Sequence, residues 1–346
     1  MQVVNIKVTE NKLVVNDVLK QILKYMPDDS IKLLPSVPTA TLAFSLANCN
    51  SSFANSIRRV LIEELPVVCL SLEEKALDTN DDFILSDVFI KNINLLPINQ
   101  ELSKDQIDDL SISLAITNDT NDIIDVKASD IKIKKHDISY LIPNANIIII
   151  RLRPGKFINV SSFTIESGYG KHNAAKFSLL NNVTYAITDV VPYDQFTDTG
   201  VRSINADCKA FDISFTTASN ITLQTVVKLL AAELTQQLTR CREKIATYAT
   251  DNSSYYFANG LEVTTVGEVR VYKFFNEYIT LNYMIAHKCY LLDKNIVYCS
   301  RSVNRYDNEI AIIKMIHPNC NKLLLAAIDE LLTDVELVRS KLLAKV

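Results

Sequence analysis

Two stretches of the chain repeat apolar residues at the spacing of an α-helix. In residues 221–248 the apolar positions step by three and four, which predicts one long amphipathic helix. Its apolar stripe comprises Val227, Leu230, Leu234, Leu238, Cys241, Ile245 and Tyr248. The polar positions outside the stripe are Lys228, Glu233, Gln237 and Arg240. Residues 321–343 predict a second long helix with a heptad-like seam of Leu324, Ile328, Leu331, Val335, Val338 and Leu342.

Neither helix can satisfy so wide an apolar face by itself. One interpretation is that the two helices pack on each other or across a shared sheet. The other is that each covers the core of its own domain, and periodicity alone does not decide between them. The order strand, helix, strands, long helix occurs twice along the chain and favours mutual pairing.

Shorter patterns fill the rest of the chain. Alternating residues 39–46 predict a strand, and a helix over residues 52–65 ends at Pro66, which lacks the N–H that a helix needs to continue. Residues 67–191 read as short strands with polar turns, and 211–217 as another strand. Beyond a polar linker we expect a strand at 268–274, a helix at 280–292 and strands at 296–302 and 309–315. The predicted fold class is therefore α+β.

Composition limits the function. The chain has 346 residues and a net charge of −4, which opposes a dominant phosphate-binding surface and predicts no strong direct nucleic-acid binding. No apolar run is long enough to span a bilayer, and the first residues are too polar for a signal peptide. We therefore expect an intracellular, soluble protein with no membrane contact.

The reactive side chains do not form a recognisable catalytic or metal motif. Seven cysteines are scattered without a CxxC pair, so a zinc knuckle or a disulfide framework is not expected. The four histidines, His136, His172, His287 and His317, lack HExxH spacing. We predict no catalytic site, no metal site and no cofactor.

Three motifs in the first part of the chain identify a family. Residues 50–70 resemble the signature of RNA polymerase alpha-type subunits, and the matching positions are Asn55, Ser56, Ile57, Arg58, Arg59, Glu64 and Pro66. Residues 87–99 are similar to the family's second motif, a Phe-Ile helix leading to Leu-Ile-Pro. Residues 152–177 are similar to its third, through Gly168, Gly170, Lys171, His172, Ala175, Lys176 and Phe177.

A further motif beyond the linker resembles the archaeal L-type subunit, through Asn276, Glu277, Thr280 and Leu281. The whole chain therefore resembles a D-type and an L-type subunit joined end to end, as in polymerases of nucleocytoplasmic large DNA viruses. In cells the two correspond to the separate third and eleventh subunits of RNA polymerase II. The resemblance implies a pseudo-dimeric D–L arrangement of two alpha-like dimerisation domains, each a mixed sheet with long helices.

The implied organisation has five parts. Residues 1–38 are an N-terminal extension, 39–72 and 205–248 the D-like domain, and 73–204 a β-rich insertion. Residues 249–260 are a linker and 261–346 the L-like domain. The D–L interface would use Val227, Leu230, Leu234, Leu238, Thr280, Leu281, Leu324, Ile328, Leu331, Val335 and Val338.

The function implied by the resemblance is that of a non-catalytic assembly platform in transcription. Its partners would be the largest and second-largest polymerase subunits and small polymerase subunits, with no homodimer required. A viral protein of this kind would work in the host cytoplasm and be packaged in the virion. The residues expected to bind the large subunits are Asn55, Arg58, Arg59, Glu64, Gly168, Gly170, Lys171, His172 and Lys176.

Alternatives remain open at this stage. Arg59 could pair with Glu63 one helical turn away instead of binding a partner. The turn around Gly168 could be a plain loop. The whole chain could also be a stand-alone β-rich interaction protein or a virion structural protein without a polymerase role.

Overall fold

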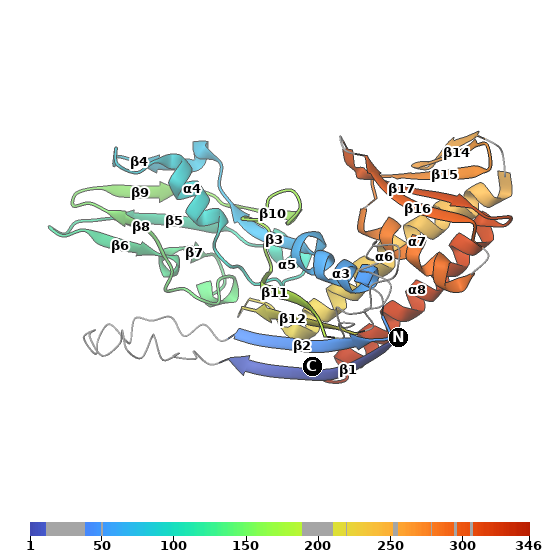
Figure 1. Cartoon of the computed structure of the whole chain (residues 1–346). Helices are drawn as coiled ribbons and strands as arrows, with labels where there is room; N and C mark the ends of the chain where they lie inside the picture. Colours follow the sequence, from blue (N-terminus) through green and yellow to red (C-terminus); the bar gives the residue numbers. More distant parts are fainter. Residues whose placement is uncertain are drawn as a thin grey trace, which may run out of the picture.

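The structure is a computed structural model that describes residues 1–11, 39–49, 51–188, 210–218, 220–251, 255–277, 279–293, 296–304 and 307–346. Most of the expected extension, Cys208 and the start of the expected 205–248 segment lie outside these residues. The described part combines helices with several antiparallel sheets (Figure 1). The predicted α+β class is confirmed.

The first sheet has the strand order β1-β2-β12-β11. It is built from β1 (Gln2–Asn11), β2 (Thr39–Ala47), β12 (Ala210–Thr217) and β11 (Leu180–Ile187). Along β12 the alternate residues Phe211, Ile213 and Phe215 are buried, as expected for a strand with one covered face. Residues 2–11, assigned to an appended extension, are instead a strand of this sheet, because β1 pairs with β2 along most of its length. Residues 180–187 were assigned to the insertion, but they too form a strand of this first sheet.

The second sheet has the order β13-β14-β15-β17-β16. Its strands are β13 (Tyr255–Ala258), β14 (Leu261–Val266), β15 (Val269–Phe275), β17 (Asp307–Ile316) and β16 (Tyr298–Asn304). Helices α7 (Ile279–Leu292) and α8 (Cys320–Leu343) follow β15 and β17 in the chain. The expected linker is not a separate segment, since α6 (Leu223–Asp251) extends into it and β13 occupies its end.

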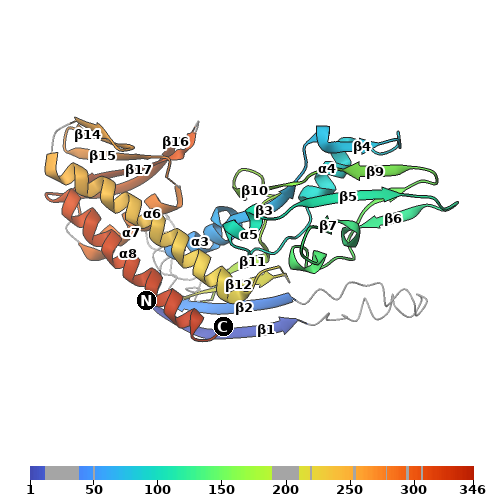
Figure 2. The same ribbon diagram turned by 180° about the vertical axis from the view of Figure 1, so that it is seen from behind.

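The long helices α6 and α8 lie side by side and connect the two sheets (Figure 2). They are antiparallel: Val227 near the start of α6 shares a pocket with Val338 near the end of α8, whereas Arg242 pairs with Asp329 near the start of α8 at 2.6 Å. A single apolar core includes buried residues of both sheets and of α3, α6, α7 and α8. The two halves of the chain therefore share one interior.

A β-rich insertion packs around its own core. It contains β4 (Leu77–Thr79), β5 (Ile112–Thr117), β6 (Ile124–Lys127), β7 (Lys132–Ile133), β8 (Ile148–Leu152) and β9 (Phe157–Val160). Its helical segments are α4 (Ser86–Asn94), α5 (Lys104–Asp108), η2 (Glu74–Ala76), η3 (Ala128–Asp130) and η4 (Ile138–Tyr140). The paired strands β3 (Pro66–Ser71) and β10 (Thr164–Tyr169) join it to the rest of the chain.

Candidate assembly interface

The alpha-type signature forms one continuous helical segment between the two halves. Helix α3 (Ser51–Arg59) runs into the π-helical turn η1 (Val60–Glu64), and Leu65 then adopts an extended conformation before β3 begins at Pro66. Phe53, Ala54 and Ile57 bury the inner side of α3. That side contacts α7 and β12, so the signature touches elements of both halves.

Glu64 lies at the centre of a buried polar cluster. Only 1% of the residue is exposed. One carboxylate oxygen accepts a hydrogen bond from the Gln237 side-chain amide at 3.1 Å, and the other accepts one from the Thr280 hydroxyl at 3.0 Å. The same Gln237 nitrogen donates to Glu233 at 2.8 Å. The cluster thus ties η1 to α6 and α7.

This position corrects one assignment made from the sequence. Glu64 was expected to face a large partner subunit, but its carboxylate points into the junction and is bonded within the chain. Burial raises the pKa of the Glu64 carboxyl above its ordinary value, and the bonds from Gln237 and Thr280 only partly oppose that rise. A buried carboxyl with satisfied oxygens fixes the relative position of the elements around it.

A second buried carboxylate, that of Glu277, contacts α6 at the polar residues that follow Gln237. Glu277 accepts from Lys244 at 2.8 Å and pairs with Arg240 at 3.3 Å. Its side chain is 1% exposed. These contacts connect Glu277, which follows the end of the second sheet's β15, directly to the long helix α6.

The polar face of α6 was misread from the sequence. Glu233 and Gln237, placed outside the apolar stripe, are both buried. Together with Arg240 and Lys244 they step by four, three and four, which is itself helical spacing. That spacing places them on one face of α6, but a solvated face shows the same spacing, so the sequence carried no signal of their burial.

The outer side of the signature helix carries the two arginines. The Arg58 Nε donates to the Asn55 Oδ1 at 2.9 Å, within the same helix. Arg59 lies 3.4 Å from a carboxylate oxygen of Glu63, which is the internal pair that the sequence left open. Arg58 and Arg59 are half-buried and near the surface of the chain.

The glycine turn packs against this helix instead of standing free. A Cβ on Gly170 would lie 2.9 Å from the backbone oxygen of Ile62, and one on Gly168 would lie 2.5 Å from the Phe177 ring. The Lys171 N–H donates to the Glu63 carbonyl at 3.0 Å. Close packing within the chain therefore accounts for both glycines.

The remaining side chains of the turn divide into two groups. Lys171 and His172 are exposed, with the Lys171 ammonium 5.9 Å from the centre of the Tyr169 ring. Lys176 is turned inward, where it pairs with Glu166 and donates to the Ser71 hydroxyl at 3.3 Å. Of the residues predicted on this turn, Lys171 and His172 are the ones that face outward.

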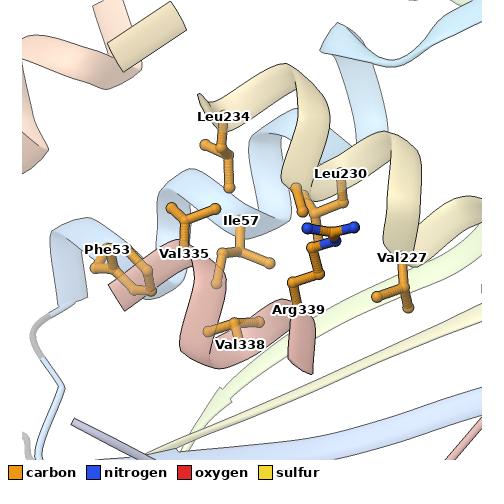
Figure 3. A pocket seen from close by; sticks show the side chains of 9 residues that line it. Phe53, Ile57, Val227, Leu230, Leu234, Val335, Val338 and Arg339 are labelled. Atoms are coloured by element: carbon orange, nitrogen blue, oxygen red, sulfur yellow. The ribbon is translucent and has the colours of Figure 1, made fainter. Parts of the chain in front are cut away.

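The apolar residues assigned to the D–L interface come together. Thr280 is a buried polar residue, and the others all belong to the shared core. Figure 3 shows a small pocket at this seam, where Phe53 and Ile57 of α3 face Val335 and Val338 of α8 beneath Leu230 and Leu234 of α6. Three helices from both halves therefore meet at one apolar junction.

Within the described residues, no three His, Cys, Asp or Glu side chains are grouped so as to hold a metal ion. Burial raises the pKa of the Cys69 thiol to about 11. In the same part of the chain, no helix combines the length and apolarity needed to cross a bilayer.

Comparison with known proteins finds RNA polymerase subunits that are similar to part of this chain. No protein-family model matches the chain. It is 26% identical over 175 residues to "DNA-directed RNA polymerase II subunit rpb3" of Dictyostelium discoideum, a match to 45% of this chain and 57% of that protein. It is 24% identical over 139 residues to "DNA-directed RNA polymerase subunit Rpo3" of Pyrococcus furiosus, a match to 39% of this chain and 51% of that protein. The chain spans about half the length of these curated relatives, and over that part it is similar to RNA polymerase subunits.

Proposed function

We propose that this chain is a non-catalytic assembly subunit of a multisubunit DNA-directed RNA polymerase, with D-like and L-like halves in one polypeptide. Its role is to hold the largest and second-largest subunits in position, together with small polymerase subunits. The polymerase subunits that it resembles support this role.

The main structural support is the position of the signature helix. Its inner side packs against α7 of the L-like half, and Glu64 at its end is bonded to both α6 and α7. A platform for two large subunits needs a rigid surface, and a buried, bonded junction supplies rigidity. The outer side of the helix then presents Asn55, Arg58 and Arg59 near the surface.

In this proposal the halves act as a pseudo-dimer in one chain. Covalent linkage raises the effective concentration of one half for the other. The shared core and the antiparallel α6–α8 pair are consistent with an obligatory platform that needs no second copy of the chain. The same proposal includes a viral origin: the chain would come from a large DNA virus, work in the host cytoplasm and be packaged in the virion.

Copurification tests the proposal. A tagged chain expressed in its natural context should recover two large proteins and promoter-dependent transcription activity. Recovery of the chain alone, or only with virion structural proteins, would instead favour the stand-alone interaction protein.

The residue-level test is Arg58→Ala. A planar guanidinium can bridge carboxylates or carbonyls of a partner, so its loss should reduce recovery of the second-largest subunit. Arg151→Ala is the matched control, because Arg151 is 74% exposed on the insertion and its ion pair among the described residues is with Asp125. Equal recovery with both variants would remove Arg58 from the proposed contact surface.

A further inference from the structure

The turn after β7 in the insertion carries a cluster of basic residues on a fixed backbone. Ile133 and His136 form an antiparallel bridge around a two-residue turn of Lys134 and Lys135. The Lys134 N–H donates to the Ser111 carbonyl at 3.0 Å, and β7 itself pairs with β5. The turn is therefore held beside β5 of the insertion.

Alternation divides the side chains of this segment between core and solvent. Ile131 and Ile133 are buried in the insertion core, whereas Lys132 and Lys134 are exposed. Lys132 lies on the exposed face of β7, and Lys134 follows in the turn. Lys135 and His136 continue the exposed run. We call residues 132–136 the basic hairpin.

Lys135 occupies an unfavourable backbone conformation. Its φ is +81°, and among the described residues every other position with a positive φ is asparagine or glycine. Those two residues occupy the left-handed region with the least strain. A lysine there gives no packing benefit, since its side chain is exposed. Such strain is found where a side chain serves a contact outside the fold.

The charges of the hairpin are not neutralised within the described part of the chain. Lys132, Lys134 and Lys135 form no ion pair there. The nearby carboxylates accept from the backbone instead: Asp130 from the Lys127 N–H at 2.7 Å, and Asp137 from the Ser139 N–H at 2.9 Å. The hairpin thus presents three lysine charges to solvent.

An aromatic pair stands beside these charges. The rings of His136 and Tyr140 are stacked, with centroids 4.5 Å apart and planes 13° from parallel. His136 is exposed, so the outer face of its ring can accept another flat group. Lysines next to an exposed aromatic face are the combination that proteins use to bind single-stranded nucleic acid, with phosphates on the lysines and a base on the ring.

We infer that the basic hairpin binds single-stranded nucleic acid, with phosphates on Lys132, Lys134 and Lys135 and a base stacked on His136. An acidic peptide would satisfy the lysines equally well, but it would not use the stacked rings. The net charge of −4 makes this a local contact of modest affinity and not a general phosphate-binding surface. The inference does not depend on the proposed polymerase role.

The test uses the full chain and a fluorescein-labelled oligouridylate, with binding followed by fluorescence anisotropy over a range of salt concentrations. Lys132→Glu/Lys134→Glu/Lys135→Glu should weaken binding more than about tenfold and reduce the slope of log affinity against log salt by about 2. His136→Ala should weaken binding by about tenfold while leaving the slope unchanged. The matched control is Lys91→Glu/Lys104→Glu/Lys322→Glu, which makes the same charge change at exposed sites elsewhere.

The possible results of this experiment either support the inference or overturn it. The inference is supported if the hairpin variants lose binding and the control variant keeps it, with circular dichroism unchanged in each. It is overturned if the intact chain does not bind, if the control loses as much affinity, or if polyglutamate binds as tightly as RNA and is unaffected by His136→Ala. Each of these results concerns the isolated chain and leaves the copurification test of the polymerase role unaffected.

Discussion

The side-chain amide of Gln237 on α6 donates to Glu64 at 3.1 Å across 173 residues of sequence. Glu64 closes the signature helix, and Gln237 lies midway along the helix that connects the two sheets. The hydroxyl of Thr280 on α7 holds the other Glu64 oxygen. This contact makes the signature helix part of the junction between the halves.

The Glu64 carboxyl should give stability a specific pH dependence. Its pKa in the folded chain is raised by burial above the ordinary value of 4.5. The folded state therefore binds the proton more tightly than the unfolded state, so the contribution of Glu64 is fully present below pH 4.5 and lost as pH rises through the folded-state pKa. Relative to Glu64→Gln, the intact chain should gain free energy of unfolding as pH falls toward 4.5.

Urea denaturation of both proteins over a pH series measures this difference. The other charged groups are common to both chains, including Arg59 and Glu63, whose charges act on Glu64. Glu63→Gln is a neighbouring control and should not reproduce the trend, since Glu63 is only half-buried. A difference that grows with rising pH would contradict the expected sign.

Glu277 should contribute more to stability than a half-buried carboxylate with a similar partner. Glu277→Gln leaves Lys244, whose side chain is only 15% exposed, without its charge partner, which should lower the free energy of unfolding by about 3 kcal/mol. Glu262→Gln removes a Glu–Lys pair at 2.9 Å on a hairpin of the second sheet and should cost below about 1 kcal/mol. If chemical denaturation shows the same loss of unfolding free energy for both variants, burial of Glu277 does not strengthen its contribution to stability.

The two turn glycines should respond differently to alanine. Gly168→Ala would press on the Phe177 ring, so replacing that ring by Phe177→Leu should recover much of a loss of about 1–3 kcal/mol. Gly170→Ala would meet the backbone at Ile62 and Glu63, which no side-chain change can move. Thermal unfolding of both double variants measures the difference, and rescue of Gly170→Ala by Phe177→Leu would contradict the packing described.

Cutting the chain between α6 and β13 should not separate its halves. A protease site placed at residues 252–254 would yield fragments whose apolar faces belong to one shared core. Burying that surface is the main favourable term in association, so the fragments should elute together at low concentration. Leu331→Ala, in the seam of α8, should favour dissociation of the cut chain, and separation of the unmutated fragments would show that the linkage alone holds them.

The sequence already contained the local elements of the molecule. The spacing of apolar residues and the helix-breaking residues predicted both long helices, the helix that ends before Pro66 and most strands outside the insertion. These elements depend on residues that are close together in the chain. The strand β13 was included in the expected linker, because an alternating pattern of four residues is too short to identify a strand.

The relations between distant segments were decided only by tertiary structure. Nothing in residues 2–11 indicates that they pair with β2, and the polar stripe of α6 does not reveal that η1 and α7 cover it. Glu64 and the two glycines were therefore assigned to the surface although they are packed within the chain. Periodicity identifies the faces of a helix or strand, but whether a polar face meets water or another part of the chain depends on long-range packing.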